Sequence, residues 1–478
     1  MTRWDAPASR PGERLFSSLL GHAGDVSAPA HDYAHAPGFD RGRAWFVWSV
    51  AVVGYVVAIA ERTSFGVAGL AAAARFQTGA SVVSLFMVVQ LLVYALMQVP
   101  AGVLTDRFGS RLTIGAGAAI MCLGQTSLAF AHDVPSALAA RVLVGIGDSL
   151  TFTSVIKLLP LWFRSRRLPL LTQLVGLFGQ LGQLISAVPL AALLFRAGWT
   201  QSFGAAAAMA AVSSVLVFTL VRATPPGTVL PQPEPGTPVR HQVRAALREP
   251  ATQLGFWGHW LTGFPALVFT MMWGFPFLQQ GEGLAPVQAS GLLALFVASA
   301  IVFGPVTGLL SQRHPLRRSN LVLIIVATQM LPWVVVLAWP GQAPLWLLAL
   351  LVFFQGSNGA GTGVSFDIAR AGNPLHRGGT ATGMVVMGGF TGALINILVI
   401  GIILDALGGD FSLTDFRWAM ASQFLFTLIG VIGLYLSRAK VRQRLIDEEG
   451  VIFLPWPDIF RREWARYQAR HDRQQAAG

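Results

Sequence analysis

Two adjacent charged residues, Glu61 and Arg62, interrupt the first long apolar run of the chain. A charge at the centre of a bilayer costs at least ~2.5–3.5 kcal/mol on insertion scales, so each one requires a partner or a function. Tyr55, Gly66 and Gly69 share the helical face of Arg62, which would let the guanidinium reach into a cavity. Because arginine donates two parallel hydrogen bonds to a carboxylate, we expect Arg62 to bind an acid group. The alternative is a structural pair between Arg62 and Glu61, or between Arg62 and a group on the second helix.

A second charged set lies in the fourth apolar run. Arg141 and Asp148 are seven residues apart, so they share a helical face and lie about 10 Å apart along the axis, with Gly145 between them. A carboxylate in apolar surroundings can hold a proton at neutral pH. We therefore assign Asp148, Arg141 and Glu61 to proton coupling, with a permanent Arg141–Asp148 pair as the alternative. Lys157 falls on the opposite face near the helix end, where a long side chain can reach the aqueous edge.

The composition predicts the elements that carry these residues. The chain has 478 residues, of which 54% are hydrophobic and 12% charged, and its mean hydropathy is +0.58. Soluble proteins carry about 25% charged residues. Apolar stretches of about 20 residues, long enough to cross a hydrocarbon core, recur throughout. We predict an all-α polytopic membrane protein. The net charge is +12, and the basic residues lie in the short segments between the apolar runs, so we expect no nucleic-acid partner. With only one cysteine, Cys122, the chain cannot form a disulfide framework.

The apolar runs predict twelve transmembrane helices. In the first half they cover about 45–74, 81–101, 112–130, 136–163 and 169–194, with a sixth that ends near 221. In the second half they cover about 251–278, 286–310, 321–338, 344–365, 379–404 and 418–436.

These helices predict five parts of the chain. Residues 1–42 form a disordered cytoplasmic tail, 43–221 and 251–437 form two six-helix bundles, 222–250 form a cytoplasmic linker, and 438–478 form a charged cytoplasmic tail. Prolines in the linker prevent one continuous helix. Arg240, Arg244 and Arg248 are expected on a short surface helix near its end.

A short charged turn separates the second and third apolar runs, and we expect its Asp106, Arg107 and Arg111 to lie where water or headgroups reach them. It reads Gly102-x-Leu104-x-Asp106-Arg107-x-Gly109-x-Arg111. Gly109 allows a tight reversal, because glycine accepts a positive φ without strain. The turn resembles the signature loop of the major facilitator superfamily, and Gly308 to Arg318 resembles a degenerate copy with Gln312 in place of the aspartate. The resemblance implies the major facilitator fold, with a substrate site between two repeats near the bilayer midplane. It also implies that the turn is a conformational motif whose aspartate helps to hold the outward-facing state.

The first helix narrows the resemblance to one branch of the superfamily. The stretch Glu61 to Ala68 is similar to helix one of the anion:cation symporters, which include sialic-acid, phthalate and hexuronate transporters. In that branch an arginine at the place of Arg62 is implicated in binding the acid group, and a glutamate usually stands where Asp148 stands. Arg141 with its two glycines resembles a further signature associated with proton movement. The resemblance implies proton-coupled uptake of a small organic anion by alternating access.

Uncharged polar and aromatic groups in the apolar runs complete the predicted substrate site. Besides Arg62, we assign to it Tyr55, Gln90, Tyr94, Gln173, Gln180, His259, Trp260, Gln355, Asn358 and Asn396. The uncharged polar groups also form ordinary hydrogen bonds between membrane helices, which is the alternative for each of them, and the alternative for Trp260 is packing in an aromatic stripe. Asp367 and Arg370 lie near helix ends, where we expect structural roles.

Other functions are less consistent with the sequence. Drug exporters that work by proton antiport usually carry Gly-x-x-x-Gly-Pro in helix five, whereas Gly176 to Pro189 contains glycines without a Gly-Pro pair, so export remains the alternative. Nitrate carriers of the superfamily use an arginine in the middle of helices two and eight, and this sequence has none there. No His, Cys or carboxylate spacing indicates an enzyme, a metal site or a cofactor.

Basic residues predict the orientation and the compartment. With both termini cytoplasmic, the inner turns hold Arg107, Arg111, Arg164, Arg166, Arg167, Arg313, Arg317, Arg318, Arg370 and Arg377, and the outer turns hold Arg75, Arg196 and Arg417. The excess of arginine over lysine is typical of a GC-rich prokaryotic genome, so we predict a multi-pass protein of a prokaryotic plasma membrane. We expect a monomer whose partners are the substrate, protons and the lipid bilayer.

Overall fold

The computed structural model describes residues 41–78, 80–226, 238–408 and 411–449. Residues 1–40 of the predicted N-terminal tail, 227–237 of the linker and 450–478 of the C-terminal tail lie outside this range. Every regular element in the described part of the chain is helical.

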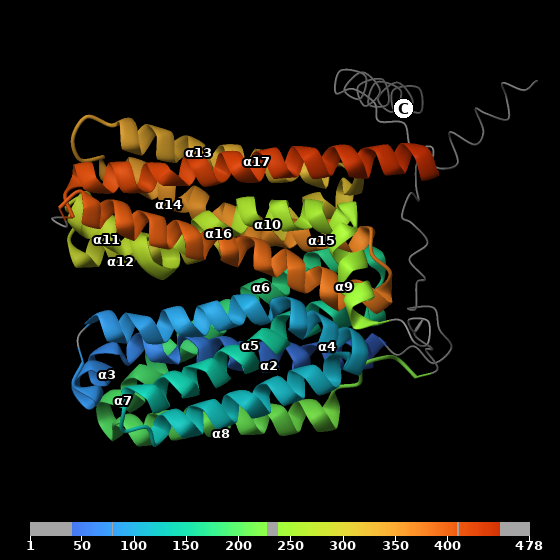
Figure 1. Cartoon of the computed structure of the whole chain (residues 1–478), viewed down its shortest axis with the longest axis horizontal. Helices are drawn as coiled ribbons and strands as arrows, with labels where there is room; N and C mark the ends of the chain where they lie inside the picture. The colour runs from blue at the N-terminus through green and yellow to red at the C-terminus, as the bar shows by residue number, and fades with distance from the viewer. Residues whose placement is uncertain (1–40, 79, 227–237, 409–410, 450–478) are drawn as a thin grey trace, which may run out of the picture.

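The first half of the chain forms one group of helices (Figure 1). Its helices are α2 (Arg41–Val67), α3 (Gly69–Phe76), α4 (Ala80–Ala129), α5 (Val134–Trp162), α6 (Leu168–Ile185), α7 (Ala191–Ala197) and α8 (Trp199–Leu220), with short turns η2 (Ser165–Arg167) and η3 (Ser186–Leu190). The predicted first helix is divided after Val67, and the predicted fifth helix contains the π-helical turn η3 around Pro189.

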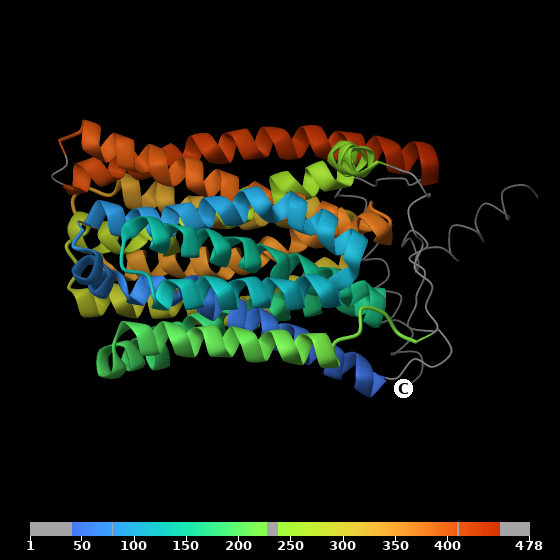
Figure 2. The same cartoon turned by 60° about the horizontal axis from the view of Figure 1, so that its bottom comes forward.

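The second half forms the other group, preceded by the linker helix α9 (Val239–Arg248). Its helices are α10 (Pro250–Val268), α11 (Gly274–Pro276), α12 (Pro286–Arg313), α13 (Arg318–Ala338), α14 (Leu345–Gly359), α15 (Gly363–Ala371), α16 (Gly378–Ala406) and α17 (Leu413–Glu449). Short turns join them: η4 (Phe269–Trp273), η5 (Phe277–Gly281), η6 (Pro315–Arg317), η7 (Ala360–Thr362) and η8 (Leu375–Arg377). Helix α17 continues past the predicted end of helix twelve, so the C-terminal tail predicted from Arg438 begins as helix (Figure 2).

The number of membrane crossings follows from one glycine. Eleven helical stretches of the described residues are long and apolar enough to cross a membrane, and one of them, Leu85–Ala129, has 45 residues. About 20 residues suffice for one crossing. Within α4, Gly109 has φ 79° and ψ 160°, which reverses the chain as the sequence predicts. Divided there, α4 supplies two crossings and the described chain has twelve, so the all-α membrane fold is confirmed.

Apolar side chains fill each bundle and also join the two. The N-terminal bundle buries Trp48 and Trp162, and the C-terminal bundle buries Phe264 and Trp333. A separate buried cluster, the inter-bundle cluster, joins the two bundles through Leu91, Tyr94 and Ala95 of α4, Phe366 and Ala369 of α15, and Val385, Val386 and Phe390 of α16. Large apolar residues such as Leu96, Leu331 and Ile402 are exposed on the outside, as expected for a surface that faces lipid.

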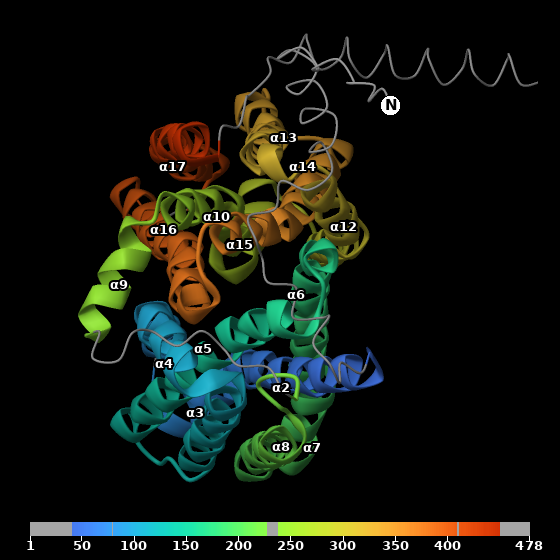
Figure 3. The same cartoon turned by 90° about the vertical axis from the view of Figure 1, so that its right-hand side faces the viewer.

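The two ends of the molecule differ. We call the end that carries α9 and the Gly109 turn the linker end, and the opposite end, with α3 and α11, the far end (Figure 1). Seen from the linker end, the two bundles lie side by side, with α4 and α6 of one facing α16 and α15 of the other (Figure 3).

Candidate functional site

An ion pair between α2 and α5 lies inside the N-terminal bundle. Arg62 Nε is 2.5 Å from Asp148 Oδ2, and Nη2 donates to Oδ1 at 2.9 Å, so the pair is bidentate. The side chain of Arg62 is 10% exposed and that of Asp148 is 1% exposed. The alternatives that paired Arg62 with Glu61 or Arg141 with Asp148 are therefore wrong about the partner. The alternative of a group on the second helix corresponds to Tyr94, whose ring lies against Arg62. Spacing within one helix identifies only neighbours on that helix, whereas this pair joins two.

Arg141 holds the neighbouring backbone instead. Its Nη2 donates to Arg62 O at 3.2 Å and to the amide oxygen of Gln90, and its guanidinium lies 5.1 Å from the ring centre of Phe65. Gly145 lets α4 approach α5 here, because a Cβ at this position would lie 2.8 Å from Gln90 O. Arg141 thus fixes the turn of α2 that carries Arg62.

Glu61 is the fourth charged group of this cluster. It is fully buried, and the described protein atoms provide no hydrogen bond to either of its carboxylate oxygens. Gln125 Nε2 donates to the Glu61 carbonyl oxygen at 3.2 Å and to Ser64 Oγ at 3.1 Å, so it orders the backbone rather than the acid. We call Glu61, Arg62, Arg141 and Asp148 the charge cluster.

Two tyrosines lie between the charge cluster and the other bundle. The guanidinium of Arg62 is 4.2 Å from the ring centre of Tyr94, whose ring is 4.7 Å from that of Phe390 on α16. Tyr55 lies 5.3 Å from Phe152 by ring centres. Tyr94 thus contacts Arg62, Gln90 contacts Arg141 and Tyr55 contacts Phe152; that these three residues bind substrate stays a prediction.

His259 lies at the bundle interface, on the C-terminal side. Its Nδ1 accepts a hydrogen bond from Gly389 N at 3.0 Å, so a neutral ring carries its proton on Nε2. The His259 ring is 5.3 Å from Phe366, which is itself 5.3 Å from Phe152 of the N-terminal bundle. A string of rings therefore runs from Tyr55 through Phe152 and Phe366 to His259.

Helix α6 also reaches the interface. Gln173 is buried beside Gly308 and Gly363 of the C-terminal bundle, where a Cβ on either glycine would meet its side chain. Gln180 lies two helical turns after Gln173 on the same face of α6 and is half-buried.

The remaining predicted site residues are bonded within the C-terminal bundle. Gln355 accepts from Gln329 at 2.8 Å, Asn358 donates to Thr328 at 3.1 Å, Asn396 donates to Ser422 at 2.9 Å, and Trp260 donates to the Phe426 carbonyl at 3.0 Å. These contacts correspond to the alternative of ordinary interhelical bonds, and the structure does not bring the four residues to the charge cluster. The sequence analysis missed Gln329, although a glutamine inside an apolar run was a visible signal.

The charged turn joins the two bundles at the linker end. The Asp106 carboxylate accepts hydrogen bonds from Gly379 N at 2.8 Å, from Thr380 N at 2.7 Å and from Thr380 Oγ1 at 2.6 Å. Lys157 Nζ lies 2.6 Å from the same carboxylate. An acid at the first turn of α16 is favoured, because free N–H groups and the helix dipole both attract it. We call this group of bonds the α4–α16 contact.

Two expectations about this turn need correction. The Asp106 side chain is only 5% exposed rather than at a wet edge, and Lys157 is 7% exposed and paired rather than extended to the aqueous edge. Both follow from the close approach of α4 and α16 at Gly102, where a Cβ would lie 2.8 Å from the Gly379 carbonyl carbon. Arg111 Nε donates to the Phe218 carbonyl at 2.9 Å, and Arg107 is exposed.

The degenerate copy of the turn makes a second contact, between α12 and α6. A Cβ on Gly308 would lie 3.2 Å from Leu170 Cα and from the Pro169 carbonyl oxygen. Arg370 Nη2 crosses to Thr172 Oγ1 at 3.1 Å, and its Nη1 donates to Asp367 at 2.9 Å. We call this the α12–α6 contact.

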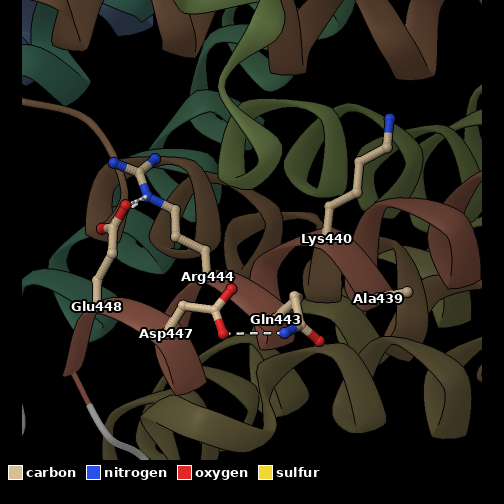
Figure 4. A pocket seen from close by; sticks show the side chains of 6 residues that line it. All are labelled: Ala439, Lys440, Gln443, Arg444, Asp447 and Glu448. Carbon is tan, nitrogen blue, oxygen red and sulfur yellow. Dashed lines mark hydrogen bonds and ion pairs between the residues drawn. The ribbon is translucent and has the colours of Figure 1, made fainter.

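Outside the bundle interface, the structure has a surface pocket on α17. A shallow surface pocket of about 550 Å³ lies on the end of α17 and is lined by Ala439, Lys440, Gln443, Arg444, Asp447 and Glu448 (Figure 4). All of these residues belong to α17, so the pocket is not part of the interface between the two bundles. Within the described residues, no three His, Cys, Asp or Glu side chains are grouped to hold a metal ion.

Comparisons with known proteins are consistent with this architecture. A family model described as Major Facilitator Superfamily matches residues 51–369. The probable nitrate/nitrite transporter NarK2 of Mycobacterium tuberculosis is 28% identical over 340 residues, which are 69% of this chain and 81% of that protein. Human monocarboxylate transporter 6 is 25% identical over 409 residues, covering 81% and 79% of the two chains. A bacterial homologue of the iron transporter ferroportin, crystallised in an outward-facing state, superposes with a TM-score of 0.67 at 12% identity over 82% of this chain and 99% of its own.

Proposed function

This chain belongs to the major facilitator superfamily, and we propose that it is a proton-coupled symporter for a small organic anion. The two bundles, 43–221 and 251–437, would rock about the charge cluster and the inter-bundle cluster, joined by the linker 222–250. The observation that carries the proposal is the bidentate pair between Arg62 and Asp148.

The pair implies competition between Asp148 and the substrate. A guanidinium that donates two bonds to Asp148 cannot donate the same two bonds to a substrate carboxylate. A protonated Asp148 is neutral and binds arginine far more weakly, which frees Arg62 for the substrate. Protonation and anion binding therefore favour each other, and by linkage the effect is reciprocal. This is the coupling that a symporter requires.

Glu61 provides a second acid for the same cycle. An ionised carboxylate with no hydrogen-bonded partner is costly to bury, so Glu61 is more stable as a neutral acid in this conformation. Arg141 lies next to the same turn of α2 through its bond to Arg62 O. We propose that Glu61 gains and loses a proton as this turn of α2 moves.

The C-terminal bundle would contribute the neutral side of the site. His259 offers an Nε2–H donor at the interface, and Gln173 faces the same interface from α6. Substrate held between Arg62 and these groups would touch both bundles, as alternating access requires.

Nitrate is the second candidate substrate. The similarity to a probable nitrate/nitrite transporter favours it, and the guanidinium of Arg62 suits any small anion. The name of monocarboxylate transporter 6 favours an organic acid instead. The absence of an arginine from the middle of the second and eighth helices also favours the organic acid.

Orientation and setting complete the proposal. Basic residues gather at the linker end, so we take this end as cytoplasmic, with both termini inside a prokaryotic plasma membrane and the protein a monomer. The α4–α16 contact then closes the cytoplasmic side, which is the role that the resemblance implies for Asp106 in an outward-facing state.

Transport by the purified full-length chain in proteoliposomes tests the proposal. With a pH-sensitive dye inside, external monocarboxylates should acidify the lumen and nitrate should not; if only nitrate does, the second candidate is correct. An anion-driven alkalinisation of the lumen would instead indicate antiport and export.

The Arg62 variants test the role of the bidentate contact. Arg62→Lys should lose transport nearly as completely as Arg62→Ala, because an ammonium cannot reproduce the bidentate contact. Arg196→Ala, which changes an exposed arginine outside the cluster, is the matched control.

Asp148→Asn separates coupling from binding. The amide removes the titration and keeps the shape, so the variant should exchange labelled for unlabelled substrate and lose accumulation driven by a pH gradient. Accumulation equal to that of the unaltered chain would remove Asp148 from the coupling role.

A further inference from the structure

The linker helix α9 carries a row of arginines without acidic neighbours in its own sequence. Arg240, Arg244 and Arg248 follow one another at four-residue intervals. At 3.6 residues per turn they lie within about 80° of one another on the helix surface. All three are exposed, and Leu247, also exposed at 39%, lies on the same side. We call these four residues the basic face of α9.

The opposite side of α9 is fixed against both bundles. Ala246 is fully buried, and the helix packs on α10 and α16 of the C-terminal bundle and on α4 of the N-terminal bundle. Figure 3 shows α9 at the edge of the molecule beside α16 and α4. The basic face is therefore directed away from the bundles.

The end of α9 is held in place by charged groups that do not belong to the face. Glu249 accepts a bond from Arg444 Nη1 at 2.7 Å, and Arg444 Nε is 2.9 Å from Glu448 (Figure 4 shows the latter pair). Gln253 Nε2 donates to the Leu247 carbonyl at 3.0 Å. The acids closest in sequence and in contact are thus committed to Arg444. Among the described residues, no ion pair involves the three arginines of the basic face.

The level of α9 relative to the membrane follows from the chain. Its last residue, Arg248, is followed after Glu249 by Pro250, the first residue of a helix that is long and apolar enough to cross the membrane. An amphipathic helix that ends within two residues of a membrane crossing lies at the level of the lipid headgroups.

We propose that the basic face of α9 binds the headgroups of anionic phospholipids. Arginines provide several parallel donors to phosphate oxygens, and a row of them attracts a negatively charged leaflet. Leu247 supplies the apolar contact with the acyl boundary that a soluble anion would not use. This binding does not depend on the transported substrate.

Thermal unfolding of the full-length chain in a neutral detergent tests the proposal. Dioleoylphosphatidylglycerol should raise the unfolding midpoint at much lower concentration than dioleoylphosphatidylcholine. The variant Arg240→Gln/Arg244→Gln/Arg248→Gln should need about a hundredfold more phosphatidylglycerol for half the effect, since each arginine near an anionic surface contributes roughly fivefold. The matched control for a single substitution is Arg196→Gln, which removes one exposed arginine from α7 at the far end, away from α9. It should need the same phosphatidylglycerol concentration as the unaltered chain, whereas Arg244→Gln should need about fivefold more.

Further variants and comparison compounds distinguish lipid binding by the basic face from other causes of stabilisation. Replacing the three α9 arginines by lysine should keep most of the response, because the attraction to the negatively charged leaflet remains and only the parallel donors to phosphate are lost. If the glutamine variant does not fold, Arg244→Gln alone should shift the half-effect concentration about fivefold. An unaltered response in the glutamine variants, an equal effect of phosphatidylcholine, or equal stabilisation by inorganic phosphate would each overturn the proposal.

Discussion

The two contacts between the bundles at the linker end share a backbone plan and differ in chemistry. In each, a glycine lets one helix approach the first turn of another: Gly102 meets Gly379 of α16, and Gly308 meets Pro169 of α6. At the α4–α16 contact an aspartate follows the glycine by four residues and bonds the first turn of α16. At the corresponding place of the other contact stands Gln312.

One residue explains why the second copy lacks an acid. Gly379 provides an N–H to Asp106, whereas the residue in the matching place on α6 is Pro169, which has no N–H to donate. An acid at position 312 would therefore lose a donor that Asp106 has. The α12–α6 contact relies instead on Arg370 and the neutral hydroxyl of Thr172. The two contacts therefore show similar close packing of helices, but we expect the α4–α16 contact to resist separation of the bundles more strongly than the α12–α6 contact does.

Of the variants that weaken one of the two contacts, Asp106→Asn should have the largest effect on the separation of the bundles at the linker end. It leaves Lys157 without an anionic partner at a buried site, and breaking a buried pair costs ~3–5 kcal/mol. In a Cys122→Ser background, the added Val386→Cys of the inter-bundle cluster should then react with a maleimide at least about a hundredfold faster, because each ~1.4 kcal/mol is tenfold. Adding Lys157→Met should return the rate toward the starting value. An unchanged rate in Asp106→Asn would mean that the pair does not hold the bundles together.

The next largest effect should come from Gly102→Ala. Its Cβ would lie within 2.8 Å of backbone atoms of Gly379 and Thr380, which cannot rotate away. Overpacking of this kind costs ~1–3 kcal/mol, so the same cysteine should react about tenfold faster. Gly308→Ala meets its nearest atoms at 3.0–3.2 Å, one of them on the flexible Gln173 side chain, and should change the rate less. Equal effects would show that the two contacts resist opening equally.

Thr172→Val should have a moderate effect. It keeps the shape of the side chain and removes the acceptor of the Arg370 bond. One such hydrogen bond contributes ~1 kcal/mol, so we expect the cysteine to react up to about fivefold faster. Thr328→Val, which removes the partner of Asn358 within the C-terminal bundle, is the control that should leave the rate unchanged.

Gln312→Asp should have the smallest effect. The substitution restores the aspartate of the signature, but Pro169 offers it no N–H. We expect a change within ~0.5 kcal/mol, as for a surface substitution, in both cysteine reactivity and unfolding midpoint. A clear slowing of the reaction would show that an acid alone is enough to strengthen the contact.

The sequence predicts the fold well because its signals are local. Long apolar runs define the crossings, and the positive φ of Gly109 follows from the residue type. The boundaries are less exact where proline or π-helical turns interrupt a run, as around Pro189, or where a helix continues into polar residues, as α17 does to Glu449. Helical propensity of charged residues, rather than hydrophobicity, sustains that last stretch.

The candidate site is only half predictable. The sequence identifies every member of the charge cluster, because a buried charge is conspicuous in an apolar run. It does not identify the pairing of Arg62 with Asp148, or of Lys157 with Asp106, because these bonds join different helices. The same limit applies to Gln355 and Gln329, where the sequence cannot distinguish a bond between helices from a ligand contact.

The pairing of one guanidinium with one carboxylate has an electrical consequence. Under the proposed exchange, a monovalent anion replaces Asp148 at Arg62 while a proton neutralises Asp148. If Glu61 keeps the same protonation state in the loaded and the empty site, the two sites carry the same net charge. Moving one elementary charge through 100 mV is worth about 2.3 kcal/mol. A cycle that moves none should run at the same rate whatever the membrane potential. A dianionic substrate moved with one proton would instead be driven outward by an inside-negative potential.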